Sequence, residues 1–392
     1  MKQNQTSSSR WLLLVLLNSA FIQAGVYVVR PMITYRSVDL GAEPWVVGLV
    51  GATFALAPLL FAILIGRWVD RGRDGFAMLL GSGILIVTSI ALILIQSIPL
   101  LMLAMPILGI GHLLVMVGGQ SMIANRSPDS KLEKNFGLLT FYASLGHAVG
   151  PFVGGLLADR GGIEVDTVPA IAFSTGLFIV GALLVVTLRH RSTVGHKEPV
   201  SSFSEIKAVL AAPTYKSAIF VAGAATAVVD VVLIFLPLLG RELGLSATQI
   251  GILLALRAFS SMAVRAVLGG ITQRFGMLSV INSGSIVTML GTLALAFVTE
   301  FWWLALVISI TGFAMGIGQP ATMAWVSRIS EPGQKGLAIS IRLTSNRLGQ
   351  VVVPTVAGVL AGFATSNVFL LLSSLQAVSV LVAHQALRRN RQ

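Results

Sequence analysis

The chain of 392 residues contains no cysteine. A disulfide framework and a thiolate metal site are therefore both excluded. Charged residues are also scarce, at 11% of the chain, whereas soluble domains carry roughly 25%. Hydrophobic residues make up 55%. This composition is typical of an integral membrane protein, and the chain has room for about twelve spans of roughly 20 residues.

Motifs of intramembrane enzymes are missing as well. The sequence has no His-Glu-x-x-His pattern and no cluster of aspartates at the ends of apolar runs. The residues that an intramembrane metalloprotease or aspartyl protease would need are therefore missing. The sequence therefore predicts neither an enzyme nor a bound metal or cofactor. No loop between apolar runs is long enough to form the soluble domain that a membrane sensor would carry.

Long apolar segments separated by short charged segments predict twelve membrane-spanning helices. The first six are expected near residues 11–34, 45–66, 76–96, 99–122, 138–158 and 168–188. The second six are expected near residues 215–239, 248–270, 278–298, 301–324, 337–361 and 365–387. We therefore predict an all-α integral membrane fold.

The twelve spans divide into two halves. We expect an N-terminal six-helix bundle (1–188), a cytoplasmic linker (189–213) and a C-terminal six-helix bundle (214–392). Residues 201–210 of the linker fit either a short amphipathic helix on the membrane surface or a disordered loop. A weak internal repeat pairs Gly66, Arg71 and Gly83 with Gly269, Arg274 and Gly284, as expected of two pseudo-symmetric halves.

The positive charge follows the expected topology. With the N-terminus in the cytoplasm, 19 of the 27 Lys and Arg residues fall in cytoplasmic segments, and only Arg36, Arg160 and Arg241 fall in outer loops. Cytoplasmic loops are enriched in basic residues, so both termini are predicted to be cytoplasmic. This bias accounts for the net charge of +12 without a nucleic-acid partner.

The fifth predicted span carries a distinctive glycine pattern. Gly146, Gly150 and Gly154 recur every four residues and share one helix face, where another helix can approach closely. Pro151 and Gly155 complete a pattern that resembles motif C of proton-coupled exporters in the major facilitator superfamily, g-x-x-x-G-P-x-x-G-G. An ordinary small-residue packing stripe is the alternative interpretation.

A second motif lies between spans two and three. The residues from Gly66 to Arg73, which include Asp70 and Arg71, resemble motif A of the same superfamily, G-x-x-x-D-R-x-G-R-[KR]. One residue is missing before the final Gly-Arg, and Asp74 stands where another basic residue is usual. The resemblance implies a latch between the two halves, and a plain basic cytoplasmic loop is the alternative.

A third motif departs further from the family pattern. Motif B places an arginine four residues before a Gly-x-Gly on the fourth span. Gly109 and Gly111 are present, but Met105 holds the arginine position. The resemblance ties that arginine to proton transfer, so proton coupling here must depend on other residues.

Charges at membrane depth cost about 2.5–3.5 kcal/mol each and usually mark a functional site. Asp230 in span seven and Arg257 in span eight lie at similar depth. They are expected either to form a neutralised pair that holds two helices together or to make Asp230 the protonation site. His112 and His147 would either relay protons or serve as interhelical hydrogen-bonding groups.

Other polar residues within spans are expected to line a cavity. These are Asn18, Gln23, Tyr27, Arg30, Gln120, Tyr142, Gln319, Asn346, Arg347 and Gln350.

Arginines outnumber acids inside the spans. Asp230 is outnumbered by Arg30, Arg257, Arg265, Arg342 and Arg347, of which Arg342 is expected to extend toward the cytoplasm. A neutral-to-positive cavity suits anionic or zwitterionic substrates, because arginine binds carboxylate and phosphate groups in a bidentate manner. Carboxylate siderophores, organic acids and anionic drugs all qualify.

The family resemblance implies a secondary transporter whose halves rock around a central cavity. Motif C implies a proton-coupled exporter, with a small-molecule substrate, protons and the lipid bilayer as its partners. We expect a monomer in a bacterial inner membrane. The alternatives are a broad multidrug efflux pump, an organic-anion importer and a lipid flippase of the same fold.

Overall fold

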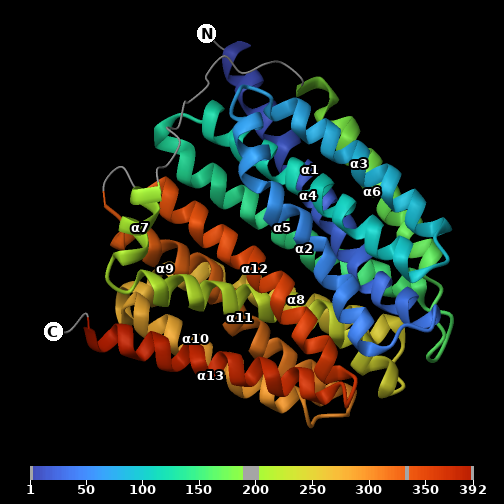
Figure 1. The fold of residues 1–392 in the computed structure, drawn as a ribbon. Helices are drawn as coiled ribbons and strands as arrows, with labels where there is room; N and C mark the ends of the chain where they lie inside the picture. The colour runs from blue at the N-terminus through green and yellow to red at the C-terminus, as the bar shows by residue number, and fades with distance from the viewer. Residues whose placement is uncertain (1–2, 189–202, 332–334, 390–392) are drawn as a thin grey trace. The chain divides into compact units, whose positions relative to one another are not determined.

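The computed structural model describes residues 3–188, 203–331 and 335–389 (Figure 1). Within these ranges the chain forms long α-helices, one 3₁₀ turn (Val186–Leu188) and no named strand. In the first half the helices are α1 (Gln3–Asp39), α2 (Pro44–Val69), α3 (Asp74–Leu94), α4 (Ile98–Arg126), α5 (Asp129–Ala158) and α6 (Thr167–Val185).

The second half repeats the pattern after one short helix. Its helices are α7 (Phe203–Ala211), α8 (Tyr215–Glu242), α9 (Ala247–Phe275), α10 (Met277–Leu295), α11 (Phe301–Ile329), α12 (Lys335–Ala361) and α13 (Ser366–Arg389). Helix α7 covers most of the linker segment for which an amphipathic helix was one prediction. Residues 189–202 of that linker lie outside the described ranges.

Eleven helices in the described ranges are long and apolar enough to cross a bilayer. Helix α12, with 27 residues, is long enough but more polar, because its first half includes Arg342, Asn346 and Arg347. Helices suit a bilayer because they satisfy every backbone polar group internally. The predicted all-α membrane fold is confirmed, and helices such as α1, with 37 residues, extend beyond the predicted apolar cores.

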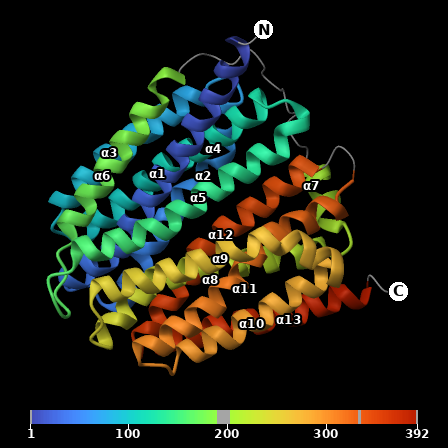
Figure 2. The ribbon, with the colours of Figure 1, turned by 180° about the vertical axis from the view of Figure 1, so that it is seen from behind.

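The first of two compact units comprises Met1–Gly41, Thr53–Glu198 and Ser246–Ala255. Helix α1 packs against α5 and α6, and α3 packs against α4 and α6, as Figures 1 and 2 show. The first residues of α9 therefore belong to the unit that is otherwise built from the N-terminal half.

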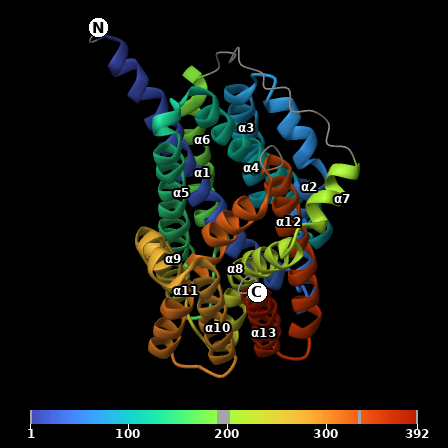
Figure 3. The same ribbon diagram turned by 90° about the vertical axis from the view of Figure 1, so that its left-hand side faces the viewer.

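The second unit comprises Ala42–Ala52, Pro199–Leu245 and Leu256–Gln392. Helix α8 packs against α11, α12 and α13, while α10 packs against α11 and α13, and Figure 3 shows this unit from another side. Helix α8 is central to the unit, because 78% of the residues in its most apolar stretch are buried. The predicted boundary between the halves, at 189–213, stays a prediction.

The glycine stripe of α5 lies against α1. A Cβ atom on Gly146 or Gly150 would collide with the carbonyl oxygens of Ala20 and Ala24, and a Cβ on Gly154 would lie 2.8 Å from the Val28 side chain. The two helices therefore touch backbone to backbone, as small residues in membrane helices allow. The predicted close-packed face is confirmed.

We predict that Gly150→Ala destabilises the protein. The added methyl group meets the backbone of α1, which has no side chain to move aside, and overpacking of this kind costs about 1–3 kcal/mol. The melting temperature of the detergent-solubilised protein should fall by several degrees. Gly176→Ala on α6 is the control, because its Cβ would meet nothing within 4 Å. Equal melting temperatures for the two variants would contradict the packing argument.

Candidate functional site

The first polar cluster joins α1, α4 and α5. The Gln23 side chain lies between two groups of α4: its Oε1 is 3.1 Å from His112 Nε2, and its Nε2 donates to Met116 Sδ at 3.0 Å. One turn further along α1, the ring of Tyr27 stacks on His147 of α5, with centroids 3.9 Å apart and planes inclined by 19°. Four residues predicted from sequence are thus brought together.

Arg30 extends this cluster toward α2. Its side chain is only 5% exposed, and its Cζ lies 4.7 Å from the centroid of Phe54. The Phe54 ring in turn lies 5.7 Å from the His112 ring. A guanidinium over an aromatic face is stabilised by the ring quadrupole, and more strongly when desolvated. These contacts build an N-terminal cluster of Gln23, Tyr27, Arg30, Phe54, His112 and His147.

The second polar group joins α8 and α12. Arg347 Nη1 donates to Gln350 Oε1 at 3.0 Å, and Gln350 Nε2 donates to Asp230 Oδ1 at 3.3 Å. We call Asp230, Gln350 and Arg347 the C-terminal array. Arg257 on α9 is 3% exposed, and its predicted pairing with Asp230 stays a prediction.

Arg342 lies deeper than expected. It is 0% exposed, and its Nη2 donates to Gln319 O, Gln319 Oε1 and Thr322 Oγ1 at 2.9, 3.1 and 2.9 Å. Gln319 also donates to Thr226 Oγ1 on α8 at 2.6 Å. The prediction that Arg342 extends toward the cytoplasm is wrong, because oxygen acceptors on α11 hold its guanidinium inside the bundle.

Four further residues predicted to line a cavity have varied surroundings. Asn18 is fully buried and donates to Gly181 O of α6 at 2.8 Å, a contact that joins two helices. Tyr142 packs edge-on against the neighbouring Phe141. Gln120 is exposed, and Asn346 is 5% exposed. Their contribution to a cavity stays a prediction.

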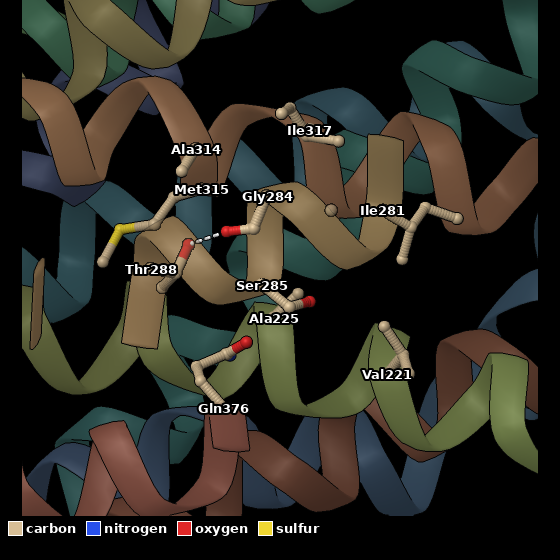
Figure 4. A pocket seen from close by; sticks show the side chains of 11 residues that line it. Val221, Ala225, Ile281, Gly284, Ser285, Thr288, Ala314, Met315, Ile317 and Gln376 are labelled. Carbon is tan, nitrogen blue, oxygen red and sulfur yellow. Dashed lines mark hydrogen bonds between the residues drawn. The ribbon is translucent and has the colours of Figure 1, made fainter. Parts of the chain in front are cut away.

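A small cavity lies inside the second unit, between α8, α10, α11 and α13 (Figure 4). Its volume is about 20 Å³, which is room for roughly one water molecule. Gln376 extends toward it from α13, and the Thr288 hydroxyl donates to Gly284 O at 2.8 Å. The cavity is polar enough for a buried water and too small for an organic substrate.

The motif A segment forms the end of α2 and the turn before α3. Asp70 and Arg71 are exposed, and Arg73 Cζ lies 5.3 Å from the Trp68 ring. Asp74, the residue that departs from the family pattern, is 0% exposed. Its Oδ1 accepts from the Gly75 amide at 2.7 Å, in the first turn of α3, where the helix dipole favours negative charge. The latch role stays a prediction.

The C-terminal end of α5 meets the start of α9. A Cβ on Gly155 would collide with Ala247 O, and a Cβ on Gly251 would lie 2.6 Å from Pro151 O. One turn after Gly155, Asp159 Oδ2 accepts from the Thr248 amide at 3.1 Å. Motif C thus gives α5 two close-packed faces, one toward α1 and one toward α9.

The start of α9 is capped twice. Ser246 N donates to Gln249 Oε1 at 2.9 Å, and Gln249 N donates to Ser246 Oγ at 3.3 Å, which is a reciprocal capping box. Asp159 adds a carboxylate to the same helix end. Hydrogen bonding by the Thr248 side chain, opposed by desolvation and aided by the Gly161 amide, lowers the pKa of Asp159 to about 2.

Comparison with known proteins decides the family. The family model of the Major Facilitator Superfamily matches residues 15–229 and 217–391. The chain belongs to this superfamily. It is therefore a multi-pass membrane transporter and not an enzyme, as the sequence predicted. Met105 of α4, where motif B has its arginine, is 1% exposed and forms part of the apolar core of this major facilitator protein.

Relatives of the transporter include proteins named for drug resistance. Multidrug resistance protein 1 of Bacillus subtilis (strain 168) is 22% identical over 352 residues, which cover 89% of each chain. Quinolone resistance protein NorA of Staphylococcus aureus (strain MRSA252) is 28% identical over 173 residues, which cover 44% of this chain and 43% of NorA.

Solved structures share the fold of this major facilitator protein. The nucleoside transporter NupG superposes with a TM-score of 0.78 at 14% identity, covering 97% of this chain and 98% of that chain. A bacterial homologue of the human lysosomal transporter Spinster gives 0.72 at 18% identity, covering 97% and 95%.

We predict that Asp159→Ala lowers the stability of the transporter in a pH-dependent way. Because folding lowers the pKa of Asp159, its stabilising effect is complete above the unfolded value of about 4 and disappears as the pH falls toward 2. The melting temperatures of wild type and variant should differ at pH 7 and converge at acid pH. Glu164→Ala, an exposed change in the same loop, is the control. A constant difference at all pH values would contradict this prediction.

Proposed function

We propose that this transporter is a proton-coupled exporter of small organic molecules, with a preference for anionic or zwitterionic compounds. Buried arginines are the observation that carries the proposal. Arg30, Arg257 and Arg342 are 5%, 3% and 0% exposed. Within the described ranges, Asp230 is the single carboxylate midway along a membrane-spanning helix.

Arginine at membrane depth favours acidic substrates for two reasons. A guanidinium stays charged in apolar surroundings, so it supplies a permanent positive potential. Its planar donors match the two oxygens of a carboxylate, and charge-assisted bonds are roughly twice as strong as neutral ones.

Proton coupling is assigned to Asp230. An aspartate buried at membrane depth can exchange a proton when its surroundings change, because both burial and nearby charge shift its proton affinity. Arg257 is proposed as a further member of the coupling site. Histidine is the side chain that commonly relays protons near neutral pH, and His112 and His147 are proposed to do so within the N-terminal cluster.

Export is supported by motif C, whose five specified positions are all filled and whose glycines make the predicted contacts. We propose that the protein is a monomer in the inner membrane of a prokaryote, with both termini in the cytoplasm. Alternating access would come from movement of residues 1–188 against residues 214–392. Broad multidrug efflux is the second candidate function, because the Bacillus relative that covers 89% of this chain is named for multidrug resistance.

We predict that an imposed pH gradient drives transport in proteoliposomes and that Asp230→Asn abolishes this drive. The amide keeps the size of the side chain but cannot bind and release a proton. Gradient-driven movement of a carboxylate substrate should fall at least tenfold, while exchange without a gradient persists. Glu300→Gln, at an exposed helix start, is the matched control. Gradient-driven transport by Asp230→Asn at the wild-type rate would remove Asp230 from the coupling role.

We also predict that Arg347→Gln weakens transport of carboxylate compounds more than that of cationic ones. The amide keeps hydrogen-bonding capacity but loses the charge that attracts an acid. The half-saturation concentration for an organic acid should rise at least fivefold in counterflow assays, with a smaller change for a lipophilic cation. A wild-type protein that moves only lipophilic cations would instead favour a general multidrug pump.

A further inference from the structure

An open groove with purely apolar walls lies on the first unit, between α2 and α4. Its volume is about 370 Å³, within the range of about 300–1,000 Å³ that ligand sites occupy. The side chains that line it are Phe61, Leu64, Ile65 and Trp68 of α2 and Ile110 of α4. We call these five residues the α2 groove. None of them belongs to the N-terminal cluster or to the C-terminal array.

The α2 groove has a fixed floor and an open rim. Ile65, Trp68 and Ile110 pack against the buried core that α2, α3 and α4 share, so protein contacts hold the floor in place. Phe61 and Leu64 form the rim and are 44% and 59% exposed. The four residues of α2 follow the i, i+3, i+4, i+7 spacing of a single helix face. The groove is therefore a continuous apolar strip along the end of α2.

The α2 groove lies on the side of α4 that faces away from the N-terminal cluster. Ile110 and His112 are two residues apart, so their side chains point roughly 200° apart around the helix. On the Ile110 face, Leu103 and Ile107 are 64% and 49% exposed. Helices α2 and α4 are both long and apolar enough to cross a bilayer. Exposed apolar side chains on this face thus contact lipid acyl chains.

Aromatic and basic side chains gather where the groove reaches the turn between α2 and α3. Arg73 Cζ lies 5.3 Å from the ring of Trp68, a residue of the groove, and the Trp68 and Phe76 ring centroids are 5.8 Å apart. Arg67 and Arg71 are exposed in the same turn. Tryptophan is enriched where the bilayer meets water. An acyl-chain surface and a basic surface are therefore contiguous at Trp68.

The acids of this turn do not neutralise its three arginines. Asp74 is 0% exposed, its Oδ1 accepts from the Gly75 amide, and it interacts electrostatically with Arg126 of α4. Asp70 is the exposed acid of the turn. The surface at the end of the groove is therefore positive. Basic residues beside a membrane span attract anionic lipids, and guanidinium donors match phosphate oxygens.

From this juxtaposition we propose that the α2 groove and the adjoining arginines bind an anionic phospholipid. One acyl chain lies along the groove against Phe61 and Leu64, and the headgroup phosphate accepts hydrogen bonds from Arg73 beside Trp68. The cation–π contact of Arg73 engages its charge and does not use up its five N–H donors. This inference is independent of the proposed function, because lipid binding requires neither a substrate nor a proton gradient.

The corresponding turn of the second half supplies a matched control. Arg274 is exposed, and its Cζ lies 5.3 Å from the Phe275 ring, the same kind of contact that Arg73 makes. The segment from Gly269 to Gly276 contains this single arginine, whereas the first-half turn has three. Arg274→Gln therefore removes the same charge and the same type of ring contact from a place outside the proposed site.

The test measures lipid binding to the full-length protein in detergent by native mass spectrometry. The ligands are phosphatidylglycerol, phosphatidylethanolamine and phosphatidylcholine with identical acyl chains. We expect phosphatidylglycerol to bind at least fivefold more tightly than either zwitterionic lipid. Arg73→Gln should weaken its binding about fivefold, the contribution of one basic residue at an anionic membrane surface, and Arg274→Gln should leave it unchanged. Equal binding of the three lipids, or equal losses in the two variants, would overturn the proposal.

Leu64→Trp tests the groove without changing any charge. Because Leu64 is 59% exposed, the larger side chain fills the groove and does not enter the core. Binding of phosphatidylglycerol should fall at least fivefold. Leu183→Trp, at a 65% exposed position of α6, should keep the wild-type affinity. Unchanged lipid binding by folded Leu64→Trp protein would overturn the proposal, as would the loss of a dimer in that variant, because a second copy would then be the occupant of the groove.

Discussion

The close approach of α5 to α1 is the constraint on which the N-terminal cluster depends. Lipid offers helices no hydrophobic reason to associate, so backbone contact through small residues has to supply the packing. Gly146 and Gly150 flank His147 on α5, and they contact Ala20 and Ala24 of α1. The same contact places the His147 ring 3.9 Å from that of Tyr27. A bulkier stripe would separate the two rings.

Sequence reasoning succeeded where a pattern has a fixed geometric meaning. Glycines four residues apart must share a helix face, and apolar runs of this length must cross a bilayer, so the stripe and the helical fold were both predictable. The partner of each face was not, because it depends on contacts between residues far apart in the chain. Gln350 reaches Asp230 across 120 positions, and Thr248 reaches Asp159 across 89.

Arg342 shows the limit of arguing from depth alone. Its position on α12 indicates how far it lies from the membrane surface but not toward which acceptors it turns. The bundle interior offers carbonyl and hydroxyl oxygens of Gln319 and Thr322 within 3.1 Å. A guanidinium with five donors can be satisfied by neutral oxygens, so burial does not require a carboxylate. The depth of Arg342 in the membrane therefore predicted that burying its charge is unfavourable. It did not predict which hydrogen-bond acceptors in the fold would compensate for that burial.

Three buried or half-buried acids differ in the groups that hold them. Asp159 and Asp74 both accept from backbone amides at helix starts. Asp230 instead meets the side-chain amide of Gln350. Asp159 and Asp74 are thus held by fixed backbone donors, whereas the partner of Asp230, the acid for which we propose proton exchange, is a side chain.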